Sequence, residues 1–493
     1  MKHLLSVLLL VLCMANASAQ FNVNYDPEIQ PKENIQYFTP KGKNLFVGDC
    51  IPFFYDGTYY LYWLVDMGHH SSLNGLGGHQ WTVSTSKDLK HWMHYPIAIG
   101  IDEEWEKSIC TGSVEHFGDK FYAFYATRLK DSLGNVNEQL SYATSPDAIH
   151  FNKQKPNPFY TSAPGYNKRD FRDPKVIIDK SGVFHLFVSS SSELNSSIDE
   201  NRGCLVHISS TDLKTWKVNE SILTGQRNVP ECPDYFYWNK WYYLVYSQNG
   251  NTSYVMSRNP YGPWQQPKFQ ALDEDWSNVV KTAEFTNGRR IAASWIPSKR
   301  DNKDDAGEMF GGCILLREVV QLKDGTLITK FPEETVSVIG PELNLNPILD
   351  SKVTKTGVGN YSIDAQGAIG SFHADKIPMN SRITLEINPL GNNDEVGLFI
   401  RSGKNASEGY KVSFSASKQT VWLGNTKIES VTGLDKPFTV DIIMKDDIID
   451  ICINNQRCIV NRLSERKGET VWFFAKQGKV AFKNIKIYPI LNE

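Results

Sequence analysis

Length, composition and charge exclude several classes of protein. The chain has 493 residues, so more than one domain is expected, and its net charge of −3 comes without a basic block of the kind that binds nucleic acid. Beyond the N-terminus, no stretch reaches the roughly 20 apolar residues that a membrane span needs. The mature protein is therefore expected neither to bind nucleic acid nor to span a membrane.

Residues 1–19 are typical of a signal peptide. A charged start precedes an apolar run from Leu4 to Cys13, and small residues occupy positions 17–19. A lipoprotein signal would use Cys13, but the bulky Leu12 stands where that signal needs a small residue. We therefore expect cleavage after Ala19 and an exported protein, periplasmic or extracellular.

Residues 20–335 repeat one loose pattern of strands. In the first unit, aromatic strands at 53–55 and 58–63 flank an Asp-Gly turn and predict a β-hairpin, and a third strand follows at 81–86. Four more units follow, and the first four of the five close on an aromatic residue: Trp92, Phe151, Trp216 and Trp264. About four strands per unit is the content of a propeller blade, so the pattern predicts a five-bladed β-propeller.

Residues 351–493 have the alternating pattern of half-buried strands and predict a β-sandwich. Residues 336–350 contain Pro341 and Pro347 among turn-forming residues and are interpreted as a linker. The fold class predicted for the whole chain is therefore all-β, with the propeller followed by a C-terminal sandwich. We expect the sandwich to brace the propeller rather than to bind glycan, because it has no evident cluster of exposed aromatic residues.

Seven of the eight cysteines remain after the expected cleavage, and an odd number argues against a dense disulfide framework. Cys452 and Cys458 flank a tight turn and are placed to face each other across a hairpin. A disulfide there and two free buried thiols are equally compatible with the sequence. The other cysteines show no metal-ligand spacing.

Three carboxylates stand at or just before predicted first strands of separate units: Asp49, Asp173 and Glu231. The first strand of each propeller blade lines the central channel, so these side chains are expected to meet at one mouth of it. A lone Asp before a strand is more often a turn or cap residue than a catalytic one. The shared position of the three acids favours a catalytic site, because hydrolysis of a glycosidic bond uses a pair of carboxylates.

The sequence around each acid suggests a different role. Glu231 is the candidate general acid, because its neighbours are apolar and rigid and favour the protonated form. Asp49 is the candidate nucleophile. Asp173 follows Arg172, which is expected to hold it ionised and suited to binding substrate hydroxyls. Asp234 is interpreted as a supporting or turn residue.

Further candidates lie in or beside loops. Three histidines follow Asp66 in a segment rich in glycine and serine, namely His69, His70 and His79. We interpret them as solvated or substrate-facing and predict no metal and no cofactor. Trp81 and Trp105 are candidates for stacking on a sugar ring.

Several motifs together resemble glycoside hydrolase family 32, the fructan hydrolases and invertases. They are Arg172-Asp173-Pro174, Glu231-Cys232, the segment 86–92, Thr111-Gly112-Ser113-Val114, Leu316-Arg317-Glu318 and the segment 450–455. The resemblance covers nearly the whole mature chain and implies a retaining β-fructofuranosidase built from a five-bladed propeller and a sandwich. It implies that Asp49 attacks the anomeric carbon, Glu231 serves as acid and then base, and Asp173 binds sugar hydroxyls. It also makes Arg172 and Ser113 candidate substrate-binding residues.

The first motif of that family is altered here. The family pattern is tryptophan-methionine-asparagine-aspartate-proline-asparagine-glycine, whereas this chain has Phe46 to Pro52 and keeps only Asp49. The glutamine usual in the next strand falls near Leu64. Two alternatives therefore stay open: a related hydrolase acting on another furanoside such as an arabinofuranoside, possibly with inversion, or a sugar-binding propeller without catalysis. The expected partner is an oligo- or polysaccharide, and the sequence leaves the oligomeric state open.

Overall fold

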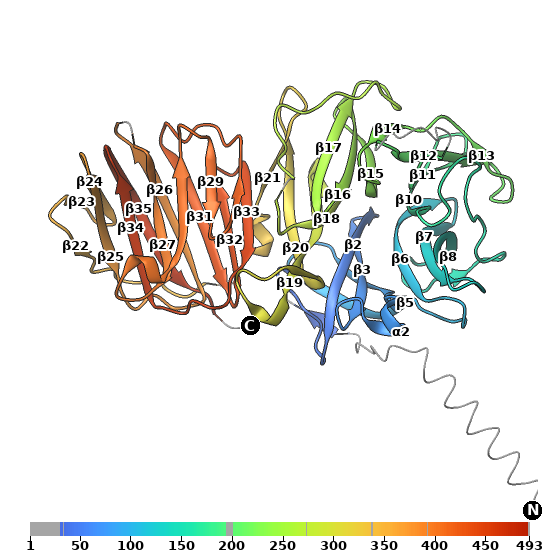
Figure 1. Ribbon diagram of the computed structural model, residues 1–493, viewed down its shortest axis with the longest axis horizontal. Helices are drawn as coiled ribbons and strands as arrows, with labels where there is room; N and C mark the ends of the chain where they lie inside the picture. The colour runs from blue at the N-terminus through green and yellow to red at the C-terminus, as the bar shows by residue number, and fades with distance from the viewer. Residues whose placement is uncertain are drawn as a thin grey trace, which may run out of the picture.

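The structure is a computed structural model that describes residues 30–491 except 33, 194–200, 273, 337, 338 and 392. The expected signal peptide at 1–19 and Cys13 lie outside the described residues. Within them the regular secondary structure is almost entirely β-strand, and Figure 1 shows two lobes side by side. Strands β2 to β21 form one lobe, coloured blue to yellow, and β22 to β35 form the other, coloured orange to red.

The first lobe consists of antiparallel sheet units in chain order. The first unit contains β1 (Gln30–Lys32), β2 (Leu45–Tyr55), β3 (Thr58–Met67), β4 (Gln80–Ser86) and β5 (Trp92–Ile99). The second contains β6 (Ser108–Phe117), β7 (Lys120–Lys130), β8 (Val136–Ser145) and β9 (Asn152–Lys153). The third contains β10 (Arg172–Ile178), β11 (Phe184–Ser191), β12 (Gly203–Ser210), β13 (Lys217–Val218) and β14 (Leu223–Gln226).

Two further units complete this lobe. The fourth contains β15 (Glu231–Trp238), β16 (Trp241–Gln248) and β17 (Asn251–Ser257), and the fifth contains β18 (Asn278–Glu284), β19 (Arg290–Lys299), β20 (Glu308–Gln321) and β21 (Leu327–Lys330). A single pairing, Val47 with Gly312, joins β2 of the first unit to β20 of the fifth. The short helical turns are α2 (Ser72–Gly75), η1 (Thr286–Gly288), η2 (Arg300–Asn302), η3 (Glu333–Thr335) and, in the second lobe, η4 (Ala406–Glu408).

Local sequence explains the hairpins of these units. Between β2 and β3, Tyr55 pairs with Thr58 across a two-residue loop in which Asp56 and Gly57 have φ of 44° and 71°. Positive φ at both positions is what a type I′ turn needs, and Asp-Gly supplies it at low cost. The expected hairpin at 53–63 is therefore confirmed, within longer strands than the sequence pattern indicated.

The first strands of the units lie at the centre of the lobe. Contacts join β2 to β6, β6 to β10, β10 to β15, β15 to β18 and β18 back to β2. The apolar faces of the units pack against one another outside this ring, as in the cluster of Tyr62, Trp81 and Tyr125 between the first and second units. The ring brings the starts of five strands together.

The second lobe is two seven-stranded sheets that share one apolar core. One sheet has the order β22 (Ile348–Leu349), β25 (Ile369–Ala374), β34 (Thr470–Lys476), β27 (Glu395–Ser402), β28 (Tyr410–Ser415), β29 (Thr420–Leu423), β30 (Thr426–Ile428). The other has the order β23 (Val353–Gly357), β24 (Asn360–Asp364), β35 (Lys479–Pro489), β26 (Ser381–Pro389), β31 (Phe438–Lys445), β32 (Ile448–Ile453), β33 (Arg457–Arg462). Side chains such as Val412 and Ile442 from the two sheets meet in that core, which makes a β-sandwich.

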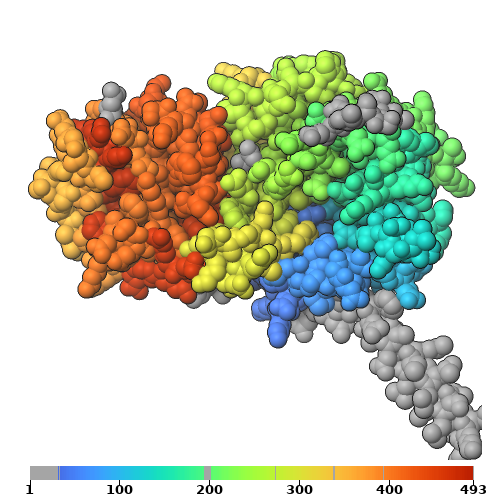
Figure 2. Space-filling view, viewed as in Figure 1, coloured from blue at the N-terminus to red at the C-terminus, as the bar shows by residue number. Residues whose placement is uncertain are grey.

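The two lobes touch along β33, which contacts β19 and β21, and Figure 2 shows them as one continuous body. Cys452 and Cys458 lie near this junction as direct cross-strand partners, and both thiols are free. Of the two alternatives left open by the sequence, the structure therefore contains the free pair. Among the described residues, no helix is long and apolar enough to cross a bilayer.

Candidate active site

A β-bulge near the start of every first strand shapes the site. The pairing register slips at Val47/Cys50, Ile109/Gly112, Arg172/Lys175, Glu231/Asp234 and Asn278/Lys281. A bulge bends the strand and redirects side chains, and bulges are frequent beside active sites. Glu231, Asp173 and Asp49 are the first, second and third residues of their bulges. Each acid therefore occupies a different position within its bulge.

Backbone strain accompanies three of these bulges. Asp173, Cys232 and Val279, the second residues of theirs, have φ of 53°, 51° and 55°. Residues other than glycine seldom adopt this left-handed conformation, which persists only where the surroundings hold it. The Cys232 amide donates a hydrogen bond of 3.1 Å to Asp173 Oδ2 and ties the bulges of β10 and β15 together.

Asp49 is a buried carboxylate with a donor at each oxygen. The indole Nε1 of Trp295 donates to Oδ1 at 2.9 Å, and the hydroxyl of Thr111 donates to Oδ2. The Cys232 thiol lies 3.8 Å from the same Oδ2. Burial and the neighbouring carboxylates Asp173 and Asp49 raise the pKa of Cys232 well above its usual value, so it remains a thiol and can donate. These contacts fix the orientation of Asp49.

Asp173 differs from what the sequence suggested. Its side chain is 6% exposed, and burial raises its pKa to about 7 against the lowering effect of Arg172. The negative charges of Glu138, Glu231 and Asp49 act in the same direction as burial. The expectation that Arg172 holds Asp173 ionised is therefore wrong, because desolvation and three nearby acids outweigh one guanidinium.

Arg172 is the centre of a network of acids. It lies 2.9 Å from Glu231 Oε1, 2.6 Å from Asp170, 3.5 Å from Glu138 and 3.6 Å from Asp173. Burial opposes its charge, yet these four carboxylates raise the pKa of Arg172 well above its usual value. A permanently charged Arg172 fixes the relative positions of Glu231 and Asp173.

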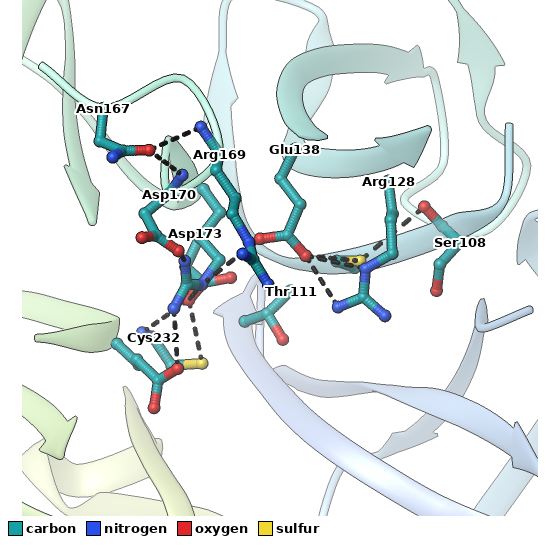
Figure 3. Close-up of polar contacts among 12 residues, drawn as sticks. Ser108, Thr111, Arg128, Glu138, Asn167, Arg169, Asp170, Asp173 and Cys232 are labelled. Carbon is teal, nitrogen blue, oxygen red and sulfur yellow. Dashed lines mark hydrogen bonds and ion pairs between the residues drawn. The ribbon is translucent and has the colours of Figure 1, made fainter. Parts of the chain in front are cut away.

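A second arginine, Arg128, extends this network through Glu138. Arg128 donates from Nε and Nη2 to Glu138 Oε1 at 3.0 and 2.8 Å. Figure 3 shows Glu138 between Arg128 on one side and Asp173 on the other. Glu138 thus connects the two guanidinium groups.

All three predicted acids line one cavity. Its volume is about 350 Å³, and its lining includes Asp49, Asp173 and Glu231 as well as Arg172. A second cavity of about 380 Å³ adjoins it. Both cavities are lined by His70, Arg128, Glu138, Arg172 and Glu231. The Glu231 side chain is 41% exposed and stands where the two cavities meet.

Two predicted substrate contacts are corrected by the structure. Trp81 is fully buried and donates from Nε1 to the Cys110 carbonyl at 2.9 Å, so it packs between units and cannot stack on a sugar. The Ser113 hydroxyl donates to the Pro174 carbonyl at 2.8 Å and accepts from the Val176 amide at 2.7 Å. Ser113 therefore joins β6 to β10. Its hydroxyl already donates and accepts within the protein, so it does not contact the substrate.

The stacking of Trp105 on a sugar ring stays a prediction. Its ring is half-buried, and its Nε1 donates to Glu103 at 2.7 Å. It lies outside the lining of both cavities.

The histidine loop folds onto the cavity. Asp66 accepts hydrogen bonds from the His69 and His70 amides at 2.9 and 2.8 Å and from His79 Nε2 at 3.0 Å. His70 and His79 line the cavity, as the sequence analysis allowed. Burial, followed by His79 and Arg128, lowers the pKa of His70 to about 4, so it is neutral and accepts from Arg128 through Nε2. Over the described residues, no cluster of three His, Cys, Asp or Glu is arranged to hold a metal ion.

Local sequence does not single out three residues of the site. Thr111 lies within a motif of the resemblance, but nothing in that motif indicates its contact with Asp49. Trp295 stands 246 positions from Asp49, and Glu138 is part of an ordinary strand pattern, so neither carried a local signal.

Comparison with known proteins identifies the family. Residues 48–331, more than half of the chain, match the family model described as the glycosyl hydrolases family 32 N-terminal domain. The chain belongs to glycosyl hydrolase family 32. This establishes the resemblance drawn from the motifs.

Curated relatives are distant. The chain is 25% identical over 332 residues to a sucrose-6-phosphate hydrolase of Escherichia coli, covering 62% of this chain and 67% of that enzyme. It is 25% identical to the sucrose-6-phosphate hydrolase of Zymomonas mobilis subsp. mobilis over 56% of this chain, and spans only 57% of that enzyme's length. A levanase of Bacillus sp. strain L7 is 23% identical over 66% of this chain and 38% of the levanase.

Solved structures share the fold over almost the whole chain. Fructan 1-exohydrolase IIa from Cichorium intybus superposes with a TM-score of 0.68 and 16% identity, covering 93% of this chain and 98% of that one. Sucrose-6-phosphate hydrolase from Lactobacillus gasseri gives a TM-score of 0.66 and 15% identity, covering 92% and 93%. The all-β architecture of the family is thus present in both lobes.

Proposed function

We propose that this protein is a retaining hydrolase of β-fructofuranosides. The observation that carries the proposal is the convergence of Asp49, Asp173 and Glu231 on one cavity from three separate strands. Family membership supports it, as do relatives that are named sucrose-6-phosphate hydrolase, raffinose invertase and levanase. An oligo- or polysaccharide with a terminal fructosyl residue is the substrate class.

In the proposed first step, a carboxylate oxygen of Asp49 attacks the anomeric carbon of the fructosyl residue. The bond from that carbon to the leaving oxygen breaks as Glu231 transfers its proton to this oxygen. Trp295 and Thr111 keep the Asp49 carboxylate oriented toward the cavity. The product of the step is a fructosyl ester on Asp49 and a free leaving group.

In the second step, Glu231 acts as a base. It removes a proton from a water molecule, whose oxygen attacks the anomeric carbon and releases Asp49. The exposure of Glu231 at the boundary between the two cavities suits both tasks, because the leaving group and then water must reach it. Retention predicts that the Asp49 and Glu231 carboxyl groups are about 5–5.5 Å apart. The second cavity is the proposed location of the leaving group.

Asp173 and Arg172 are assigned to substrate binding. Asp173 is buried in the lining of the same cavity and is proposed to hydrogen-bond to fructosyl hydroxyls. Arg172 is proposed to position both Asp173 and Glu231 through its ion pairs.

We also propose that the first lobe is a closed five-bladed propeller. The cyclic contacts of β2, β6, β10, β15 and β18 support this arrangement. The proposed division is a signal peptide at 1–19, the propeller at 20–335, a linker at 336–350 and the sandwich at 351–493. Strand β22 begins at Ile348, inside the proposed linker. The leader-like N-terminal sequence supports a proposal of export to the periplasm or beyond the cell.

The decisive variant is Glu231→Gln. The amide has nearly the shape of the acid but cannot supply a proton, so kcat on levan, inulin or sucrose should fall by roughly 10²–10⁴-fold. Product analysis by chromatography measures the effect, and arabinan serves as a furanoside control that should not be cleaved. Glu220→Gln, at an exposed position away from the cavities, is the matched control and should leave turnover unchanged.

Unchanged turnover in Glu231→Gln would refute the assignment of the acid. Cleavage of arabinan in preference to all three fructosides would refute the proposed substrate class.

A further inference from the structure

Gly48, next to the proposed nucleophile, stands against an aromatic ring. A Cβ atom placed at Gly48 would lie 2.9 Å from Cε1 and 3.1 Å from Cζ of Phe310, and 3.2 Å from Cβ of Leu64. Carbon atoms in van der Waals contact are about 3.5–4.0 Å apart. The Phe310 ring therefore occupies the space into which a side chain at position 48 would project.

The ring of Phe310 is held in place from several sides. It stacks on His79 with a centroid distance of 4.8 Å and an interplanar angle of 17°, and it meets the edge of His70 at 5.4 Å. Trp295, the residue that donates to Asp49, lies 4.9 Å from it. The backbone is anchored as well, because His69 Nδ1 donates to the Phe310 carbonyl at 2.8 Å. A ring fixed in this way can act as a rigid wall.

This wall adds an apolar part to the lining of the cavity. Phe310, Leu64 and Met309 contribute apolar side chains to its lining, while Arg172, Glu231 and Asp173 supply charged groups. An apolar wall neither donates nor accepts hydrogen bonds, so it recognises a sugar only through its C–H surface. Phe310 is half-buried, which leaves part of the ring available for such a contact.

We propose that Phe310 is a specificity-determining residue that packs against an apolar face of the bound fructosyl residue. The proposal rests on the proposed function and adds to it how the sugar is selected. A site that hydrogen-bonds a hydroxyl rejects the analogue that lacks it by about 10⁴–10⁵-fold, whereas an apolar pocket discriminates far less. We assign to this contact the C–H surface at one of the two hydroxymethyl groups of the fructosyl residue. The hydroxyl of that group then contributes little to binding, and removing it is tolerated.

The test compares three substrates with one leaving group: 4-nitrophenyl β-D-fructofuranoside and its 1-deoxy and 6-deoxy analogues. For the wild-type protein, kcat/KM for at least one deoxy analogue should remain within about tenfold of the parent, in keeping with an apolar contact. A loss of more than about tenfold for both analogues would overturn the proposal. If the parent itself is not cleaved, the proposed function fails and this inference fails with it. If the parent fructofuranoside is cleaved and neither deoxy analogue is, the proposed function stands and only the role of Phe310 is contradicted.

Removing the Phe310 ring gives an independent test. Phe310→Ala should lower kcat/KM for the parent by roughly 10–100-fold, mainly through KM, because a ring contact is lost while Asp49 keeps its donors. Phe117→Ala is the matched control, since Phe117 is exposed at the far end of β6 and should leave kcat/KM unchanged. Parent activity within twofold of wild type in Phe310→Ala would contradict the proposal.

A double variant separates this role from a folding defect. Gly48→Ala should displace the ring and reduce kcat/KM, and the same change in a Phe310→Ala background should cost much less because the space is free. The loss in the double variant should therefore be smaller than the product of the single losses, since contacting residues couple. Multiplicative losses, with circular dichroism showing all variants folded, would overturn the proposal.

Discussion

At the scale of single residues, three acids from the starts of separate strands line the cavity: Asp49, Asp173 and Glu231. The pKa of Asp173 depends on burial and on residues far away in the chain, which no local pattern encodes. Its sequence neighbour Arg172 is outweighed by desolvation and by Glu138, Glu231 and Asp49.

The raised pKa of Asp173 makes stability depend on pH. The folded carboxyl has a pKa of about 7, whereas an unfolded Asp titrates near 3.9, so between these values the folded state binds more protons. Stability is then lost as pH rises through this window, by on the order of 1.4 kcal/mol per pH unit. Asp173→Asn cannot ionise and should not show this loss.

The measurement is urea unfolding of wild type and Asp173→Asn between pH 4 and pH 8. The variant should gain in free energy of unfolding relative to wild type as pH rises to about 7, and the difference should then level off. Asp119→Asn, in an exposed turn, is the control and should follow wild type. A constant difference between Asp173→Asn and wild type across this range would contradict the assigned cause.

At the scale of elements, the sequence predicted hairpins and strand starts but missed the bulges. A bulge adds one residue to a strand without altering its apolar alternation elsewhere, so the pattern of β6 or β10 looks regular in sequence. The bulges decide which side chain enters the cavity: Thr111 does so from β6 and reaches Asp49, whereas Ser113, two residues further on, bonds to β10. This explains why the expectation for Ser113 was wrong.

The bulge of β6 should be sensitive to a single methyl group. A Cβ at Gly112 would lie 1.9 Å from the Phe124 carbonyl and 2.7 Å from the Tyr125 Cα, and backbone atoms cannot turn away as a side chain can. Gly112→Ala is expected to destabilise the protein by about 3 kcal/mol and to reduce activity through Thr111. Gly307→Ala is the control, because no atom lies within 4 Å of its Cβ position.

Thermal unfolding and turnover on a fructoside measure both effects. Equal unfolding temperatures and equal turnover for Gly112→Ala and Gly307→Ala would contradict this account. They would show that the β6 backbone moves freely and does not fix the position of Thr111.

At the scale of the whole molecule, the two-lobed all-β fold was accessible from strand patterning and motifs. The contact between the lobes could not be predicted from these patterns, because it depends on buried charges from distant segments. Arg317 of β20 donates to both oxygens of Asp450 in β32 at 2.8 and 2.7 Å and pairs with Glu274 at 3.1 Å. Tyr37 also donates to Asp450 at 2.7 Å. The contacts of Arg317 and Tyr37 with Asp450 join the two lobes, and Glu274 pairs with Arg317 from within the first lobe.

Arg317→Met should weaken this junction strongly. It leaves Asp450 and Glu274 buried without their cation, and breaking a buried pair costs about 3–5 kcal/mol. Lys303→Met is the control across the same junction, because Lys303 and Glu465 form an exposed pair at 3.1 Å and such pairs contribute about 0–1 kcal/mol. Equal urea midpoints for the two variants would contradict the structural role of Arg317.

The stereochemistry of the reaction tests the central claim most directly. With methanol as acceptor, the released fructosyl group forms a methyl fructofuranoside that does not mutarotate, so proton NMR reports the configuration set by the enzyme. A double displacement through Asp49 predicts the methyl β-fructofuranoside from a β-fructofuranoside donor. Formation of the α anomer would show single displacement and contradict Asp49 as nucleophile.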